Sequence, residues 1–456
     1  MSISLASLSA CFQGVIPSII ATSSKDGEPN VTYLSQVYYL DEKHVALSCQ
    51  FFNKTKQNVM ENPYAAVELH DAVTFQTYDL DLKYVRSETE GPLFEQMRIR
   101  IEAIASHTGM SGIFRLLSAD IYEVLDVRKV DGFFRPDAKH VPKKLPDVDQ
   151  RYELRALQAI SGRLNQAKDL EDLLGSLLAE MKKELGFEHT MILIPDDSGD
   201  KLITVASTGY GESGVGAEIE IGKGLIGSVA KEKCILRMGA VGEDLRYGRA
   251  VRGETHTSAL AHVVTPEIPL PGLPDAQSHL GIPLLVQDRL VGVLAVESKN
   301  PMGFSEWHEA FLGIIGNQVA IAMERMTDEN EEVLVDIRPS IVNDVPPPRV
   351  RSFKFYKGED CVFVDGQYLI RNVPARILWK LLQSYTAEKR CEFTNRELRL
   401  DPWLGLPPVK DNLESRLILL RKRLEQKCPD VRIPTCARGH FRLEVDCSVE
   451  LIELPC

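Results

Sequence analysis

The stretch from Lys410 to Val445 reads KDNLESRLILLRKRLEQK, followed by CPDVRIPTCARGHFRLEV. Leucines recur in its first half at steps of four, three and four, namely at Leu413, Leu417, Leu420 and Leu424. This spacing predicts one apolar stripe on a helix of about four turns. After a Cys-Pro-Asp break, the second half alternates in the way that predicts a β-hairpin with Arg438-Gly439 at its tip. Basic and polar side chains lie off the leucine stripe, so the two elements are suited to contacting bases and phosphates in a DNA groove.

Charge is distributed unevenly along the chain. The 456 residues carry a formal net charge of −12. From Arg351 to Cys447 there are 19 lysines and arginines against 13 aspartates and glutamates, whereas the rest of the chain has 34 against 52. A basic end on an acidic body is the asymmetry expected when a single domain contacts DNA.

The length predicts about three domains. An apolar fraction of 44% and a charged fraction of 26% are typical of globular proteins that are not embedded in a membrane, and no run of about 18 apolar residues predicts a membrane span. The N-terminus lacks the basic region of a signal peptide. Nine cysteines occur without CxxC or Cys/His spacing, which favours reduced thiols in the cytoplasm over disulfides or a zinc site.

Residues 1–132 are rich in strand signals. IPSIIATSS, the turn KDGEPN, VTYLSQVYYL and HVALSCQFF predict two hairpins in succession. A short helix is predicted from Lys54 to Met60, ended by Asn62-Pro63, and a longer one from Gly91 to Glu102. Further strands are predicted from Thr74 to Leu82 and over ADIYEVLDVRKV. About six strands with small helices predict a barrel.

The order IATSSKDGEPNVTYLSQVYYLDEKHVALSCQFFNKTKQNVMENPYAAVEL resembles the pyridoxamine 5′-phosphate oxidase-like split barrels that bind FMN. The resemblance implies a homodimer with flavin between the subunits, and Ser35 and Gln36 beside its isoalloxazine ring. The whole cofactor set that the resemblance implies is Ser35, Gln36, Ser48, Gln50, Lys54, Thr55, Lys56 and Asn58. Helix N-terminal amides with Lys54 and Lys56 suit a phosphate. The alternative is that both lysines are solvated charges at a helix start.

The oxidases of that family continue into a segment with Arg and Trp that binds pyridoxal phosphate. This chain continues instead into GFFRPDAKHVPKKLPDVDQ, which is a linker rich in proline and lysine. Oxidation of pyridoxamine phosphate is therefore not expected.

Residues 150–328 resemble a GAF domain. The motifs that carry the resemblance are the glycine-rich run from Gly222 to Gly227, the hairpin IPLLVQDRLVGVLAVES and the closing helix from Ser305. The resemblance implies an α/β sandwich that senses an unidentified small molecule, or none. Covalent bilin is not expected, because Ser278-His279 lacks the thiol of bilin-binding members. Cys234 follows Lys233, so either its thiol pKa is lowered or it is a buried apolar residue.

Three prolines, Pro346 to Pro348, mark a second linker before residues 351–447. Three strands, a helix from Pro374 to Tyr385, a second short helix capped at Thr394-Asn395, and the helix and hairpin quoted first then follow. This order resembles the winged-helix domains of OmpR-type response regulators. The resemblance implies that the third helix enters the major groove and that the hairpin wing contacts the backbone. The DNA contacts that it implies are Asn412, Ser415, Arg416, Leu419, Lys422 and Arg423 on the helix, and Arg438 and Arg442 on the wing.

Two departures limit this resemblance. The wing reads Arg438-Gly439-His440-Phe441-Arg442 instead of the family's Gly-x-Gly-Tyr-Arg, and no receiver domain with a phosphorylatable Asp precedes it. Phosphorelay control is therefore not expected. A winged helix that contacts only protein is the alternative.

Together the patterns predict a multidomain α+β protein with an N-terminal β split barrel, a central GAF α/β sandwich and a C-terminal winged helix-turn-helix. The function we expect is that of a cytoplasmic, homodimeric, one-component transcription regulator that binds double-stranded DNA and responds to a small-molecule effector or to redox state. The alternative is an FMN-dependent oxidoreductase regulated by its GAF domain. No catalytic constellation and no metal site is predicted.

Overall fold

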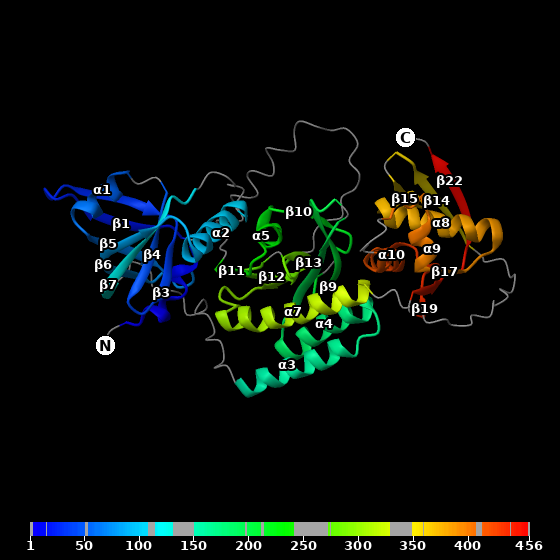
Figure 1. Cartoon of the computed structure of the whole chain (residues 1–456), viewed down its shortest axis with the longest axis horizontal. Coiled ribbons are helices and arrows are strands. Elements are labelled where there is room, and N and C mark those ends of the chain that lie inside the picture. Colours follow the sequence, from blue (N-terminus) through cyan, green and yellow to red (C-terminus); the bar gives the residue numbers. More distant parts are fainter. Residues whose placement is uncertain are drawn as a thin grey trace.

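The protein forms three domains that follow one another in the chain (Figure 1). The computed structural model describes residues 3–14, 16–50, 53–107, 115–130, 150–196, 198–210, 214–240, 272–273, 275–328, 349–358, 360–406, 413–437 and 439–454. We refer to the N-terminal, middle and C-terminal domains, which are blue, green to yellow, and orange to red in Figure 1.

The N-terminal domain is a curled seven-stranded sheet in the order β2-β1-β5-β6-β7-β4-β3. Its strands are β1 (Ser18–Ser23), β2 (Pro29–Leu34), β3 (Val37–Asp41), β4 (His44–Cys49), β5 (Tyr64–His70), β6 (Thr77–Glu88) and β7 (Ser118–Val130). Two 3₁₀ turns precede them at Leu5–Leu8 and Cys11–Gln13, and the helices are α1 (Asn53–Glu61) and α2 (Pro92–His107). Alternate residues of the strands line one apolar core, as the period of two in a strand requires. The predicted split-barrel-like sheet is confirmed.

The middle domain has a six-stranded sheet in the order β10-β9-β8-β13-β12-β11. Its strands are β8 (His189–Pro195), β9 (Lys201–Thr208), β10 (Glu218–Glu220), β11 (Leu236–Met238), β12 (Ser278–Val286) and β13 (Arg289–Ser298). Its helices are α3 (Gln150–Asn165), α4 (Leu170–Leu185), α5 (Gly224–Glu232) and α7 (Glu306–Asp328). Helices α3, α4 and α7 share one apolar core with one face of the sheet, and α5 packs in a second core on the other face.

The C-terminal domain has a four-stranded sheet, β16-β15-β14-β22, a three-stranded sheet, β17-β20-β19, and a short pair, β18-β21. The strands are β14 (Val350–Tyr356), β15 (Cys361–Val364), β16 (Gln367–Arg371), β17 (Glu392–Thr394), β18 (Val431–Arg432), β19 (Thr435–Ala437), β20 (His440–Arg442), β21 (Glu444–Val445) and β22 (Ser448–Leu454). The helices are α8 (Asn372–Glu388), α9 (Asn395–Leu400) and α10 (Leu413–Lys427).

Two predicted features of the C-terminal domain are confirmed. The four leucines of the stripe on α10 are at most 1% exposed and belong to the core of this domain. The predicted cap of α9 is also present, because the Thr394 hydroxyl accepts a hydrogen bond of 3.2 Å from the Glu397 amide. One strand was not predicted. β22 lies beyond the predicted limit at Cys447 and pairs in parallel with β14, so the folded unit extends to Leu454.

Two junctions connect the domains. Helix α2 of the N-terminal domain packs on α5 and β11 of the middle domain, and α10 of the C-terminal domain packs on α4 and β9. Within the described residues, we find no helix with the length and apolar character that crossing a bilayer would require.

Candidate functional site

Four of the eight residues predicted to bind a cofactor meet at the ends of β2 and β4. The hydroxyls of Ser35 and Ser48 lie 3.0 Å apart, and the Gln50 side-chain amide donates to Ser35 over 2.8 Å. Ser48 also accepts a hydrogen bond from the backbone amide of Gln36. The structure therefore brings these four residues together.

The side chain of Gln36 is 1% exposed, and neither its amide nitrogen nor its oxygen has a hydrogen-bond partner among the described residues. Burying an amide without partners costs about 1–3 kcal/mol. Such a group is the kind of feature that a bound heterocycle with hydrogen-bonding edges could satisfy.

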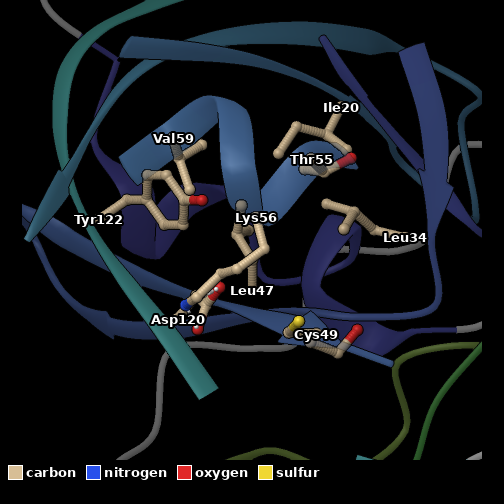
Figure 2. A pocket seen from close by; sticks show the side chains of 10 residues that line it. Ile20, Leu34, Leu47, Cys49, Thr55, Lys56, Val59, Asp120 and Tyr122 are labelled. Carbon is tan, nitrogen blue, oxygen red and sulfur yellow. Dashed lines mark hydrogen bonds and ion pairs between the residues drawn. The ribbon is translucent and has the colours of Figure 1, made fainter. Parts of the chain in front are cut away.

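Lys56 does not point to an open anion site. Its ammonium lies 2.8 Å from a carboxylate oxygen of Asp120 inside the barrel (Figure 2). It also contacts the hydroxyl of Ser87. Asp120 is 5% exposed and accepts further hydrogen bonds from Ser87 and Ser118. Burial lowers the pKa of Lys56, but the hydrogen bond and charge of Asp120 outweigh it and raise the pKa. The pair is therefore an internal ion pair.

The cavity beside this ion pair is small. It measures about 10 Å³ and is lined by residues of β1, β2, β4, α1 and β7, among them Cys49, Thr55 and Tyr122 (Figure 2). That volume accommodates about one water molecule. This cavity is therefore too small for a flavin.

The remaining predicted residues lie on the N-terminal turns of α1. Lys54 is exposed and pairs with Glu28 over 2.9 Å, whereas Thr55 accepts a hydrogen bond from Asn30 and Asn58 donates one to Thr22. Thr55 and Asn58 are buried. In the single chain both lysines pair with carboxylates, and Thr55 and Asn58 make hydrogen bonds within the domain, so a phosphate bound here would have to replace these partners. Whether this set binds FMN stays a prediction.

The glycine-rich run of the middle domain forms a turn before α5. Gly222 and Gly224 have positive φ angles of 91° and 62°, which glycine adopts readily. A Cβ on Gly227 would collide with the Glu220 carbonyl oxygen, so the helix passes close to β10 only because this residue is glycine. The interpretation of this run as a GAF turn and helix start fits this geometry.

The possibility that Cys234 has a lowered thiol pKa is wrong. Burial, and to a smaller extent the charge of Glu232, raise its pKa to about 11, although Arg98 of the N-terminal domain opposes the shift. A neutral thiol is a poor nucleophile and a poor metal ligand. Among the residues that the structure describes, we find no group of three or more His, Cys, Asp or Glu side chains that could hold a metal ion.

The predicted groove-facing residues of α10 were expected on an open surface, and that expectation is wrong for four of them. The buried residues and their exposed fractions are Ser415 at 4%, Arg416 at 7%, Leu419 at 7% and Arg423 at 5%. The Arg423 guanidinium donates to the Leu369 carbonyl oxygen of β16 over 2.9 Å, and Leu419 belongs to the domain core. Whether these residues contact DNA stays a prediction.

The other four predicted DNA contacts have different positions. Lys422 is half-buried, and burial lowers its pKa although Glu171 and Glu425 oppose the shift. Arg442 lies on β20, which pairs with β17 and β19, and is partly exposed. Asn412 and Arg438 lie outside the described residues.

The sequence did not indicate the acidic partners of these cations. Asp120 lies in the strand segment ADIYEV, and Glu171 and Glu218 lie in the middle domain, far along the chain from the lysines and arginines that they face. Only a three-dimensional pairing of strands and domains brings them together. No local spacing in the sequence could have identified them.

Residues 7–127 match the family model of pyridoxamine 5′-phosphate oxidase, and residues 167–324 match the GAF domain family model. An uncharacterised protein of Methanocaldococcus jannaschii is 48% identical over 50 residues, which are 10% of this chain and 34% of that protein. The chain thus spans about a third of the length of this curated relative.

Two solved structures with similar domains have low sequence identity. The GAF domain of an Acinetobacter phosphoenolpyruvate-protein phosphotransferase is 22% identical and covers 38% of this chain and 93% of that chain, with a TM-score of 0.29. An FMN-binding protein from Syntrophomonas wolfei is 14% identical and covers 28% of this chain and 90% of that chain, with a TM-score of 0.23. On the two family models, the chain contains a pyridoxamine 5′-phosphate oxidase-like N-terminal domain and a GAF domain.

Proposed function

We propose that this protein is a cytoplasmic, one-component transcription regulator that binds double-stranded DNA through a C-terminal winged helix. Its N-terminal and GAF domains sense a small-molecule effector or a redox state. The observation that carries the proposal is the order of elements in the C-terminal domain. Strands β14 to β16, α8, β17, α9, α10 and the β19-β20 hairpin follow one another as in OmpR-type winged helices.

The sequence of α10 supports the same role. Its leucine stripe lies in the domain core, and Ser415 and Lys422 of the predicted groove-facing set lie on the opposite side of the helix. The domain is basic while the rest of the chain is acidic, which favours a role in contacting phosphates. On this proposal α10 enters the major groove and the hairpin with Arg442 contacts the backbone.

A homodimer is part of the proposal. The outer surface of the barrel exposes large apolar side chains, including Val31 at 65%, Tyr33 at 69%, Tyr64 at 55% and Leu125 at 50%. Tyr64 and Leu125 also line an open groove of about 430 Å³. Apolar surface of this kind favours association, and a two-fold dimer would present two winged helices to a repeated site.

Signalling on this proposal is a shift of population. An effector that binds one arrangement of the domains more tightly than another changes the fraction of chains able to bind DNA. The effector of the GAF domain is a small molecule whose identity the residues do not specify.

DNA binding across a salt series tests the proposal. Fluorescence anisotropy of a labelled mixed-sequence duplex of about 30 base pairs, titrated with the full chain, measures affinity at rising NaCl. We expect affinity to fall linearly on a log–log plot, because each phosphate neutralised releases counterions. The proposal would be refuted by weak affinity that is independent of salt, if it is found both in the full chain and in the variants described below that separate α10 from the middle domain.

An FMN-dependent oxidoreductase is the second candidate. The unpartnered Gln36 amide beside Ser35 and Ser48 favours a bound heterocycle, whereas the paired Lys54 and Lys56 disfavour the flavin phosphate. The absorption spectrum of the purified protein separates the two candidates. Flavin bands that persist through gel filtration, together with absent DNA binding, would favour the oxidoreductase.

A further inference from the structure

The face of α10 opposite the leucine stripe is covered by the middle domain. Ser415, Ile418 and Lys422 are spaced i, i+3 and i+7, so they lie on one side of the helix. That side faces α4 and β9 (Figure 1). Two separate sets of contacts, one apolar and one charged, hold it there.

The apolar contact is made by Ile418. It is 1% exposed and packs in the core of the middle domain, whereas the buried leucines of α10 pack in the core of the C-terminal domain. Ser415 lines a cavity of about 140 Å³ together with Leu170 and Ile194 of the middle domain. From the middle domain, Val215 is likewise 2% exposed and part of the C-terminal core cluster, and Ile203 of β9 packs against the same cluster. The two domains therefore exchange buried side chains.

The charged contact consists of two ion pairs between the domains. Arg421 donates to Glu171 at the first turn of α4 over 3.1 Å, and Arg371 at the N-cap of α8 donates to Glu218 of β10 over 2.9 Å. Glu218 is also held by Lys201 over 2.9 Å. Carboxylates of the middle domain thus pair with two arginines of the C-terminal domain and occupy the place that another anion, such as a phosphate, would take beside them.

We propose that the middle domain carries an intramolecular docking site for the C-terminal domain, formed by Glu171, Glu218, Ile203 and Val215. This docking site competes with DNA for α10. This inference rests on the proposed DNA-binding function. A helix whose outward face lies against α4 cannot insert that face into a major groove, because a groove about 12 Å wide admits little more than the helix itself. DNA binding therefore requires the C-terminal domain to leave the middle domain.

Charge reversal of the two carboxylates tests the competition. The variant is Glu171→Lys with Glu218→Lys in the full chain. Its matched control is Glu188→Lys with Glu306→Lys, which adds the same charge on two exposed residues of the same domain that, among the described residues, form no ion pair with the C-terminal domain. A milder pair, Glu171→Gln with Glu218→Gln, is measured beside Glu188→Gln with Glu306→Gln in case the lysine variant does not fold.

Two readouts separate release of the helix from DNA binding. Acetylation of Lys422 by acetic anhydride, followed by mass spectrometry, reports release without DNA, with exposed Lys427 of the same helix as the internal reference. Anisotropy of a labelled 30-base-pair mixed-sequence duplex reports DNA affinity. We expect Lys422 to be acetylated several-fold faster, and the duplex to be bound at least tenfold tighter, in the opened variants than in their controls.

Each other outcome contradicts the inference in a different way. Faster acetylation of Lys422 in the opened variants, with DNA bound equally well by the native chain, these variants and the controls, refutes the competition and leaves the proposed function standing. Faster acetylation of Lys422 without DNA binding in any variant refutes both the competition and the proposed function. Unchanged acetylation together with unchanged DNA affinity refutes the role of the two carboxylates as the docking contacts.

Discussion

The two regions that the sequence predicts to bind phosphate differ in where their neutralising carboxylates come from. In the N-terminal domain, Lys54 and Lys56 pair with Glu28 and Asp120 of the same domain. In the C-terminal domain, Arg371 and Arg421 pair with Glu218 and Glu171 of the middle domain. In both regions these cations are paired with carboxylates in this structure. Only the second can open by a movement of whole domains.

The comparison separates a structural use of charge from a regulatory one. Opening the pair of Lys56 would leave a buried carboxylate inside a barrel with space for about one water molecule. Opening the pair of Arg421 would return Glu171, whose side chain is 41% exposed, to solvent. The first change disrupts a fold, whereas the second separates two folded units.

The largest expected effect distinguishes the two sides of α10. Leu420→Ala should lower the free energy of unfolding of the C-terminal domain by about 2–5 kcal/mol, because it leaves a cavity in that core. Ile418→Ala should lower the free energy of unfolding of this domain by less, because Ile418 packs against the middle domain. Loss of that contact favours separation of the two domains over unfolding of either one. Hydrogen exchange of α8 amides under native conditions measures both. Equal losses in the two variants would contradict the assignment of Ile418 to a separable contact.

A smaller effect is expected for the two lysines of the N-terminal domain. Lys56→Met should destabilise the barrel by about 1–3 kcal/mol, because Asp120 is left buried with only hydroxyl partners. Lys54→Met is the matched control and should cost less than about 1 kcal/mol, because both members of its pair are exposed. Hydrogen exchange of β4 and β7 amides measures the difference. A Lys54 variant as unstable as the Lys56 variant would show that the two pairs are not distinguished by burial.

A still smaller effect is expected when one contact between the domains is removed. Burial raises the pKa of Glu218, but Arg371 and Lys201 outweigh it and lower the pKa below its usual value. Its contribution to docking is therefore present above the ordinary glutamate range and is lost as pH falls through the lowered pKa. The rate of Lys422 acetylation should not respond to Glu218 protonation between pH 6 and pH 8. The Glu218→Gln substitution should raise that rate modestly at each pH. This account would be contradicted if the exposure of Lys422 changed between pH 6 and pH 8 and if Glu218→Gln abolished that change.

The smallest effect concerns the junction between the N-terminal and middle domains, which should stay closed when α10 is released. Cys234 lies there, near Glu232 and Arg98, with its pKa raised to about 11. As pH rises, the thiol ionises in the unfolded chain before it ionises in the folded chain. The contribution of this thiol to the free energy of unfolding is therefore fully present below pH 9 and falls as pH rises toward 11. Iodoacetamide should therefore alkylate Cys234 more slowly than exposed Cys436 at pH 8, in the native chain and in the Glu171/Glu218 variants alike. Faster alkylation of Cys234 in those variants would show that the two junctions open together.

Much of the fold followed from local patterns in the sequence. The leucine stripe of α10 and the Thr394 cap each act through neighbours within a few residues, so local spacing predicts them, whereas the glycine-rich run at Gly222 was interpreted through the resemblance to GAF domains. β22 was missed because it pairs in parallel with a strand almost one hundred residues earlier, and no turn signal joins them.

The candidate sites were predicted less completely, for the same reason. A sequence shows that Lys56 and Arg421 are cations at the surfaces of helices, but their charges are neutralised by residues distant in the chain. Whether a cation is open to a ligand depends on that pairing. The exposure of the predicted DNA contacts therefore depended on how two domains dock, which no spacing within α10 contains.

The most direct test is the distance between the middle and C-terminal domains with and without DNA. Spin labels carried by unnatural amino acids at exposed Lys183 of α4 and Glu388 of α8 report it in the full chain by double electron–electron resonance. The account predicts one narrow distance distribution in the free protein, which is replaced by a different and broader distribution when a saturating mixed-sequence duplex is added. Saturation with DNA while the distribution of the free protein is retained would show that α10 does not leave the middle domain, and would contradict the central claim.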